Sequence, residues 1–322
     1  MNIIINIILL LAGFVLLIKG ADFFVDGASA LARKFKIPPL VVGLTIVAMG
    51  TSAPELAVSI SASLSGANSM AVSNVIGSNL FNLLAVLGVC SVIIPSVVTT
   101  DLLKRDYPVS IAVSGIFLAM LFIGGGRGVV TRAESVVLVL LLAGYMLWTV
   151  LSALKNPSNE VSDEKPFIWW KCALCIIGGA AAIVFGGNLV VNNAGSLGAA
   201  FGMSETLIGL TICAVGTSLP ELVTSITAAR KGENDMAMGN VIGSNIFNVL
   251  MILGISGVIS PISIDTISVT DTLTDCVIYI AICLLAYIFC ITGKKITKAE
   301  GGMLVSLYIG YMVFAIMREY AF

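Results

Sequence analysis

Residues 43–88 read GLTIVAMGTSAPELAVSISASLSGANSMAVSNVIGSNLFNLLAVLG, and residues 209–254 read GLTICAVGTSLPELVTSITAARKGENDMAMGNVIGSNIFNVLMILG. The two stretches align without a gap at an offset of 166 residues, and 29 of their 46 positions are identical. The same offset relates Pro95 to Pro261 outside these stretches. Self-similarity at a fixed offset indicates duplication of a structural unit, so we expect the chain to contain two copies of one unit.

The composition places the whole chain in a membrane. Of its 322 residues 58% are hydrophobic and only 11% are charged, whereas soluble domains carry about 25% charged residues. Apolar runs approach the roughly 20 residues that a membrane helix needs, at 3–18, 109–123, 135–151 and 277–291. The first run has no basic start, so we expect a membrane helix there and not a cleaved signal peptide.

Each unit is expected to contain five membrane helices. The expected spans are 2–20, 39–64, 69–92, 108–125 and 133–152, then 167–191, 205–229, 235–258, 272–292 and 300–318. Because five is odd, the second unit must enter the membrane from the opposite side, which is the inverted repeat of many secondary transporters. The sequence thus predicts an all-α polytopic protein of ten transmembrane helices, with repeats at 1–152 and 167–322 joined by a short linker at 153–166.

The basic residues predict the orientation. If the N-terminus lies outside, only Arg127, Arg132 and Arg318 of the 17 basic residues face outward, and the other 14 face the cytoplasm. Cytoplasmic loops carry such an excess of Lys and Arg. We therefore expect a protein of the cell membrane with both termini extracellular and the central loop cytoplasmic.

Several classes of function are excluded by what the chain contains. The net charge of −1 gives no electrostatic reason to bind nucleic acid. The chain has no His, and thus lacks the usual ligand of zinc, iron and copper and the usual acid–base switch near neutral pH. It contains no G-x-S-x-G or H-E-x-x-H motif. We expect neither an enzyme nor a bound cofactor, and we interpret Cys172 and Cys175 as small packing residues.

Two carboxylates lie deep inside expected spans, at equivalent positions of the repeat. Glu55 follows Pro54, and Glu221 follows Pro220. Charged residues within membrane spans are costly and are candidates for function. Proline interrupts helical hydrogen bonding, so we expect a break that frees backbone carbonyls near residues 48–51 and 214–217. Unpaired carbonyls are tolerated in a membrane only where they line a cavity.

The next span of each unit carries a second row of polar side chains, spaced four residues apart on one face. These are Asn74, Ser78 and Asn82 in the first unit, and Asn240, Ser244 and Asn248 in the second. Carboxylate, hydroxyl, amide and carbonyl oxygens together suit a hard cation, and calcium accepts six to eight of them in flexible geometry. Buried Ser and Asn also join membrane helices to one another, so both roles stay open for Asn74 and Asn240, and for Ser59 and Ser225 helix packing is the favoured role.

The paired GTSAPE and GTSLPE motifs, each followed by NVIGSN, resemble those of the cation/calcium antiporter superfamily, in particular its prokaryotic sodium/calcium exchangers. The resemblance covers essentially the whole chain. It implies an ion site formed by the second, third, seventh and eighth helices, and a first and sixth helix that slide as a pair across the others. The implied calcium ligands are Glu55, Glu221, Thr51 and Thr217, with Asn82 and Asn248 in the middle of the site. The implied sodium sites are Ser52, Ser78 and the Ala48 carbonyl, and Ser218, Ser244 and the Ala214 carbonyl.

One position departs from part of the family. Potassium-dependent animal exchangers and some prokaryotic ones carry Asp where this chain has Asn248, so the resemblance implies transport without potassium. We therefore expect a secondary antiporter, acting as a monomer in the bilayer, that exchanges calcium for sodium. Exchange of about three sodium ions per calcium ion would move one net charge, worth about 2.3 kcal/mol per 100 mV. The alternatives are a calcium/proton antiporter of the same fold, an antiporter of another divalent or trivalent cation, and a passive cation channel.

Overall fold

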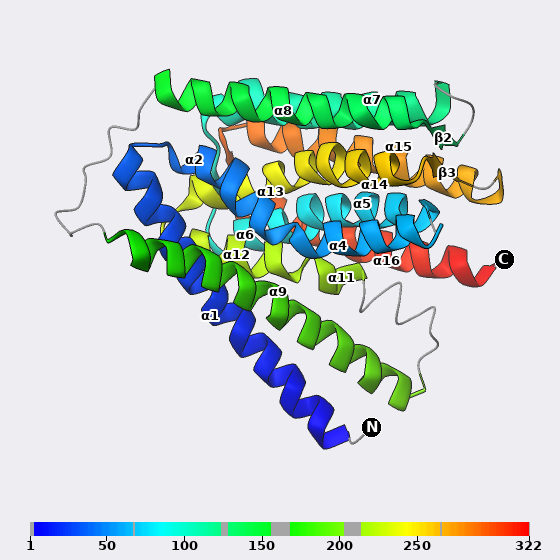
Figure 1. Ribbon diagram of the computed structural model, residues 1–322, viewed down its shortest axis with the longest axis horizontal. Coiled ribbons are helices and arrows are strands. Elements are labelled where there is room, and N and C mark those ends of the chain that lie inside the picture. Colours follow the sequence, from blue (N-terminus) through cyan, green and yellow to red (C-terminus); the bar gives the residue numbers. More distant parts are fainter. Residues whose placement is uncertain are drawn as a thin grey trace.

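The computed structural model describes residues 3–66, 68–123, 128–155, 168–202, 214–264 and 266–321, and the chain is mostly helical there (Figure 1). Eight described helices are long and apolar enough to cross a membrane: Ile3–Phe35, Met70–Ile93, Leu102–Ile123, Arg132–Lys155, Trp169–Ala200, Asn234–Ile259, Thr272–Ile291 and Lys298–Arg318. A ninth span arises if Pro39–Thr51 and Ala53–Leu64, which meet at a bend of 47°, are taken together. The protein is therefore a multi-pass membrane protein.

The elements follow one another in a similar order in the two halves. The first half contains α1 (Ile3–Phe35), α2 (Pro39–Val42), the π-helical η1 (Gly43–Val47), α3 (Ala48–Thr51), α4 (Ala53–Leu64), α5 (Asn68–Phe81), η2 (Asn82–Val86), α6 (Leu87–Ile93), β1 (Ser96–Val97), η3 (Leu102–Asp106), α7 (Tyr107–Ile123), β2 (Val129–Val130) and α8 (Arg132–Lys155). The second contains α9 (Trp169–Ala200), α11 (Ala214–Thr217), α12 (Leu219–Arg230), α13 (Asn234–Phe247), η5 (Asn248–Leu253), α14 (Gly254–Ile259), β3 (Ile262–Ser263), α15 (Thr266–Ile291), β4 (Lys295–Ile296) and α16 (Lys298–Ala321).

The ends expected for the first and sixth helices were wrong. The first was expected to end at residue 20 and the sixth at residue 191, but α1 continues to Phe35 and α9 to Ala200. Charges such as Lys19 end the apolar stretch without ending the helix, because a helix can continue past the hydrocarbon layer. Helix α1 stops only where Lys36 adopts a φ of 54°, the left-handed conformation common just after a helix. Of the span expected at 205–229, the part at 203–213 lies outside the described residues.

Helices α1 and α9 lie side by side and run obliquely to the other helices (Figure 1). With 33 and 32 residues, each is about 50 Å long, which exceeds a hydrocarbon core of about 30 Å and fits a tilted crossing. Glycines bring the two backbones together. A Cβ on Gly13 would lie 2.9 Å from the Gly186 carbonyl oxygen, and one on Gly20 would lie 2.9 Å from that of Gly179.

The centre of the molecule is formed by the third span of each half. The apolar windows of Met70–Ile93 and Asn234–Ile259 are 78% and 83% buried, whereas those of α1 and α8 are 22% buried. A helix that is buried all round needs no lipid-facing apolar surface, so it can carry polar residues that face a protein interior. These two spans carry the two polar rows that the sequence analysis identified.

Two short strand pairs join the halves. β1 pairs with β4 through Ser96 and Ile296, and β2 pairs with β3 through Val130 and Ile262. Because β1 is equivalent to β3 and β2 to β4 in the repeat, the two pairs are the same contact with the halves exchanged. The arrangement of the described loops is therefore close to two-fold symmetric.

Candidate cation site

The second span of the first half breaks at Ser52, which leaves the helical region with φ −80° and ψ 7°. Helix α4 restarts at Ala53 with Pro54 in its first turn, where a missing N–H removes no helical bond. Ser218 shows the same break at φ −95° and ψ 5°, before α12. Glu55 and Glu221 thus lie in the first turn of a helix, where the backbone dipoles favour negative charge.

Each of the two carboxylates is held by a serine of the opposite half. Ser218 Oγ donates to Glu55 Oε1 at 3.0 Å, and Ser52 Oγ donates to Glu221 Oε1 at 3.1 Å. Both glutamates are at most 1% exposed. No described Lys or Arg forms an ion pair with either. These bonds between the halves hold two buried carboxylates in one region, and neither carboxylate has a cationic partner among the described residues.

Four carboxylate and amide oxygens in this region are buried and have no hydrogen-bond partner among the described residues. They are Oε2 of Glu55 and Glu221, and Oδ1 of Asn82 and Asn248. They form two equivalent pairs in the repeat. A buried polar atom without a partner costs about 1–3 kcal/mol, and a charged one costs more. Two carboxylate and two amide oxygens left unpaired at equivalent positions are the kind of donor set that a cation site requires.

A second pair of asparagines, which the sequence analysis missed, holds the first pair. Asn82 Nδ2 donates to Asn245 Oδ1 at 3.1 Å, and Asn248 Nδ2 donates to Asn79 Oδ1 at 2.9 Å. Both amide nitrogens are used in this way, so the Oδ1 atoms of Asn82 and Asn248 stay available. The signal was present, since Asn79 and Asn245 are identical in the two repeats and lie three residues before Asn82 and Asn248.

Around this centre, the hydrogen bonds run between the halves. Ser78 Oγ lies 3.1 Å from Ser218 Oγ, and Ser244 Oγ lies 3.5 Å from Thr51 Oγ1. Ser52 is bonded to Glu221 and not to Ser78, so the two sodium sites expected within single repeats stay a prediction. Thr217 Oγ1 is buried and unpaired, as a ligand atom would be.

The backbone carbonyls expected to be freed differ between the halves. The Ala48 carbonyl accepts the Ser52 N–H at 3.0 Å and lies 3.3 Å from Thr51 Oγ1, so it is not freed by the break. A single helical bond spans the kink because the chain bends at Ser52, after the last residue of α3. In the second half the Ser218 N–H bonds to the Val215 carbonyl at 3.2 Å, in place of that of Ala214.

The outer asparagines of the two polar rows join neighbouring helices. Asn74 Nδ2 donates to Ser59 Oγ at 3.1 Å, and Asn240 Nδ2 donates to Ser225 Oγ at 2.8 Å. Asn240 Oδ1 also accepts from Thr51 Oγ1 at 3.1 Å, so this asparagine contacts the candidate site as well. The bonds to Ser59 and Ser225 support the packing role for both serines and explain why these polar residues recur in both repeats.

A third buried carboxylate was also missed, and it shows the contrast with the two glutamates. Asp106 is completely buried, yet Arg105 Nε and Nη2 donate to its Oδ1 and Oδ2 at 2.9 and 3.0 Å. Tyr145 OH donates to Oδ1 at 3.2 Å. Because its charge is paired and both oxygens are bonded, Asp106 has a structural role and leaves no oxygen for an ion.

The donor set determines the chemistry of the site. Among the described residues no group of three or more His, Cys, Asp or Glu side chains could hold a metal. The candidate site instead combines two carboxylates with neutral oxygens of Asn, Ser and Thr. Such a set suits a hard cation that exchanges readily, because two carboxylates balance one divalent charge and neutral oxygens replace its water.

The comparisons with known proteins show the family of the chain. The family described as "Sodium/calcium exchanger protein" matches residues 5–151 and 171–317, two segments offset by the length of the internal repeat. The putative antiporter CaxA of Alkalimonas amylolytica is 39% identical over 94% of this chain and 96% of its own length. The sodium/calcium exchanger MaX1 of Methanosarcina acetivorans is 34% identical over 96% of this chain and 98% of its own.

A solved structure has the same fold along nearly the whole chain. The sodium-calcium exchanger NCX_Mj, soaked with zero Na+ and Ca2+, superposes with a TM-score of 0.83 at 32% identity. The match covers 97% of this chain and 99% of that protein. Sequence, fold and the paired buried carboxylates all lead to one conclusion: the chain belongs to the sodium/calcium exchanger family of the cation/calcium antiporter superfamily.

Proposed function

We propose that this chain is a secondary active antiporter that exchanges calcium for sodium by alternating access, without potassium. The observation that carries the proposal is the set of four buried, unpaired oxygens on Glu55, Glu221, Asn82 and Asn248. Two carboxylates without a cationic partner are unstable in a low-dielectric interior unless an ion neutralises them. A calcium ion supplies both missing charges at once.

Sodium competes for the same oxygens. It is close to calcium in size and accepts the same ligands, but each sodium ion neutralises only one carboxylate. Sodium ions beside the carboxylates also need neutral oxygens. The Ala48 carbonyl can serve although it accepts a helical bond, because it keeps a second lone pair. The other neutral oxygens are the Ala214 carbonyl and the hydroxyls of Thr51, Ser52, Ser78, Thr217, Ser218 and Ser244. Exchange of about three sodium ions for one calcium ion then moves one net charge per cycle, worth about 2.3 kcal/mol per 100 mV.

The architecture we propose has ten membrane helices in two inverted repeats of five, with both termini outside the cell membrane and the central loop in the cytoplasm. The strand pairs support it. β1 and β4 lie in loops that the distribution of basic residues assigns to the cytoplasm, and β2 and β3 lie in loops assigned to the outside. Each pair joins two loops on one side, as a consistent topology requires.

The test is calcium flux in proteoliposomes that contain the purified full-length protein. Radiolabelled calcium uptake is measured with an outward sodium gradient, then with an outward proton gradient, and then with neither, at matched ionic strength. We expect uptake with the sodium gradient at fixed pH. Uptake that follows only the proton gradient would establish the calcium/proton alternative, and uptake without any coupling gradient that dissipates a calcium gradient would establish a channel.

A further inference from the structure

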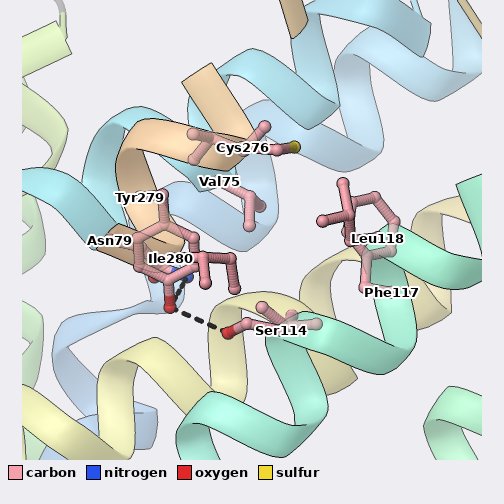
Figure 2. A pocket seen from close by; sticks show the side chains of 10 residues that line it. Val75, Asn79, Ser114, Phe117, Leu118, Cys276, Tyr279 and Ile280 are labelled. Carbon is pink, nitrogen blue, oxygen red and sulfur yellow. Dashed lines mark hydrogen bonds between the residues drawn. The ribbon is translucent and has the colours of Figure 1, made fainter. Parts of the chain in front are cut away.

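One of the two central asparagines is the start of a chain of hydrogen bonds that leaves the candidate site. Asn248 Nδ2 donates to Asn79 Oδ1 at 2.9 Å, and Asn79 Nδ2 donates to Tyr279 OH at 3.1 Å. Tyr279 OH lies 3.0 Å from Ser114 Oγ, which in turn donates to the Ser110 carbonyl at 2.8 Å. Figure 2 shows the middle of this chain, where Tyr279 of α15 reaches Asn79 of α5 and Ser114 of α7.

The direction of every hydrogen bond in this series is determined by its last member, the bond from Ser114 to the Ser110 carbonyl. Ser114 gives its single proton to the Ser110 carbonyl, which can only accept, so Ser114 accepts from Tyr279. The Tyr279 oxygen then accepts from Asn79 Nδ2, which also faces the Asn245 backbone carbonyl at 3.5 Å. Asn79 therefore turns its Oδ1 to Asn248. The amide nitrogen of Asn248 is used, and its Oδ1 is directed away from Asn79.

The other half of the molecule lacks this support. At the positions equivalent to Tyr279 and Ser114 the chain has Val113 and Ile280, which cannot form hydrogen bonds with their side chains. Accordingly Asn245, the equivalent of Asn79, donates to nothing from its buried Nδ2. Asn82 is thus held only by an asparagine whose own orientation is not held. The near two-fold symmetry of the site ends at this layer.

Apart from Tyr279, the described residues leave Asn79 Nδ2 one acceptor, the Asn245 backbone carbonyl at the longer distance of 3.5 Å. The ring borders a small pocket between α5, α7 and α15 (Figure 2), lined largely by apolar side chains such as Val75, Phe117, Leu118 and Ile280. Apart from the weakly polar Cys276, the polar side chains of the lining are Asn79, Ser114 and Tyr279 themselves. Without the Tyr279 hydroxyl, only the long bond to the Asn245 carbonyl holds the amide of Asn79, so its preference for presenting Oδ1 to Asn248 is weakened.

We propose that Tyr279 is a positioning residue of the cation site: through Asn79 it keeps the Asn248 oxygen directed at the ion, so that the two halves of the site bind calcium unequally. The inference rests on the proposed function and deepens it. An Asn248 amide turned the other way would present hydrogens to the cation, which replaces an attraction with a repulsion. The Asn82 side, which has no such chain, contributes the weaker and more adaptable ligand.

The test compares Tyr279→Phe with Tyr107→Phe. Tyr107 is also a buried tyrosine, and its hydroxyl donates to the Cys283 carbonyl at 3.2 Å, so both hydroxyls join α7 to α15. Sodium-driven calcium flux and the rise in thermal unfolding temperature on calcium addition are measured for each full-length variant. We expect Tyr279→Phe to raise the calcium KM and the concentration for half-maximal stabilisation about tenfold, which corresponds to about 1.4 kcal/mol, with the maximal rate retained.

Tyr107→Phe is expected to lower the unfolding temperature without changing either calcium concentration. Unchanged calcium affinity in Tyr279→Phe, or an equal loss in both variants, would overturn the inference. If Tyr279→Phe does not fold, Ser114→Ala replaces it with an expected rise of about threefold, and an unchanged value overturns the inference. Calcium stabilisation without sodium-driven flux in the wild-type protein would refute the sodium coupling alone, and the affinities would still decide the role of Tyr279. Absence of calcium binding to the wild-type protein would overturn both proposals.

Discussion

At the scale of single residues, burial alone does not separate the two carboxylates proposed to bind an ion from the paired carboxylate of Asp106. Glu55, Glu221 and Asp106 are all buried within or next to membrane spans. Asp106 has an arginine and a tyrosine on its oxygens. The glutamates each have one serine hydroxyl and one oxygen without a partner. The difference between the two glutamates and Asp106 therefore lies in the unsatisfied oxygen and not in the buried charge.

We expect Glu55→Gln and Glu221→Gln each to reduce sodium-driven calcium uptake to the level of empty liposomes. Each change removes half of the charge that balances calcium in a low-dielectric site, where an uncompensated charge is very unfavourable. Each variant should also unfold at a higher temperature than the wild type in calcium-free buffer, because the repulsion between two buried carboxylates is gone. Calcium should no longer raise that temperature.

Asp101→Asn serves as the control for this prediction, because Asp101 is an exposed carboxylate at the start of the fourth span. It should retain both the uptake and the calcium-induced stabilisation. Normal uptake in either glutamate variant would refute the assignment of the site.

Potassium should neither be required for transport nor stimulate it. Asn82 and Asn248 provide neutral oxygens at the centre, so the site holds two negative charges and no third that could balance a potassium ion. The measurement is calcium uptake at a fixed sodium gradient, with potassium and then choline as the balancing cation on both sides. A potassium requirement would show that another group supplies the missing charge.

At the scale of elements, the candidate site is built on four departures from the regular α-helix. Helices break at Ser52 and Ser218, and the third span of each half widens into a π-helical segment, η2 or η5, that begins at Asn82 or Asn248. π-helical turns are rare and are often found at functional sites. By shifting the helical register, each one changes the face on which its asparagine and the residues after it lie.

Close packing of α1 on α9 gives a prediction at this scale. Gly20→Val places a side chain 2.9 Å or less from the backbone of Gly179, so the two helices must separate. We expect a loss of about 1–3 kcal/mol in the free energy of unfolding and slower calcium exchange. The measurements are thermal unfolding in detergent and calcium flux.

Gly144→Val is the matched control. Gly144 lies inside α8, and a Cβ there would meet no atom within 4 Å. Because valine is a better helix former than glycine, this variant should be at least as stable as the wild type. Equal losses in the two variants would show that helix propensity, and not the contact between α1 and α9, sets the effect.

At the scale of the whole molecule, the two halves carry equivalent candidate ligands in different surroundings. Lys231 Nζ donates to Asp26 Oδ1 at 2.7 Å and to the Asp22 backbone carbonyl at 2.7 Å, and so ties α1 to the turn after α12. The repeat-equivalent residues of α9 are the neutral Asn188 and Asn192. Together with Tyr279, this difference makes the surroundings of the two halves unequal.

Exchange should be electrogenic and its dependence on sodium sigmoidal. Two carboxylates balance one calcium ion, and about three sodium ions carry one further charge, so a potential of 100 mV, inside negative, should favour calcium exit by about 2.3 kcal/mol. The ratio of calcium concentrations that the exchange can maintain across the membrane thus changes roughly 40-fold. Calcium flux in proteoliposomes under imposed potassium–valinomycin potentials measures it. Sodium-dependent flux that ignores the potential would demonstrate electroneutral coupling.

The sequence by itself determined that the chain is a multi-pass membrane protein, that it contains a repeat, and that two glutamates lie at equivalent positions inside apolar segments. The length of the apolar segments, the distribution of charged residues and the similarity of 43–88 to 209–254 can be seen without knowing which helices are in contact. The break between α3 and α4 could also be predicted, because Pro54 interrupts a continuous helix in any tertiary setting. The capping pattern T-x-x-E at Thr131 and Thr297 likewise forms in both halves, with Glu134 and Glu300 bonding back to the threonine N–H at 2.8 Å.

Only the tertiary structure decided which oxygens are left for the ion. Whether Glu55 or Asp106 is satisfied depends on side chains that lie far apart in sequence, such as Ser218 and Tyr145. The same holds for Asn79, whose orientation is set by Tyr279 from another helix 200 residues away. A hydrogen bond is a contact between two specific atoms, and periodicity cannot specify a partner across the fold. The sequence shows that Val113 stands where the other half has Tyr279, but only the tertiary contact of Tyr279 with Asn79 shows that this difference reaches the candidate site.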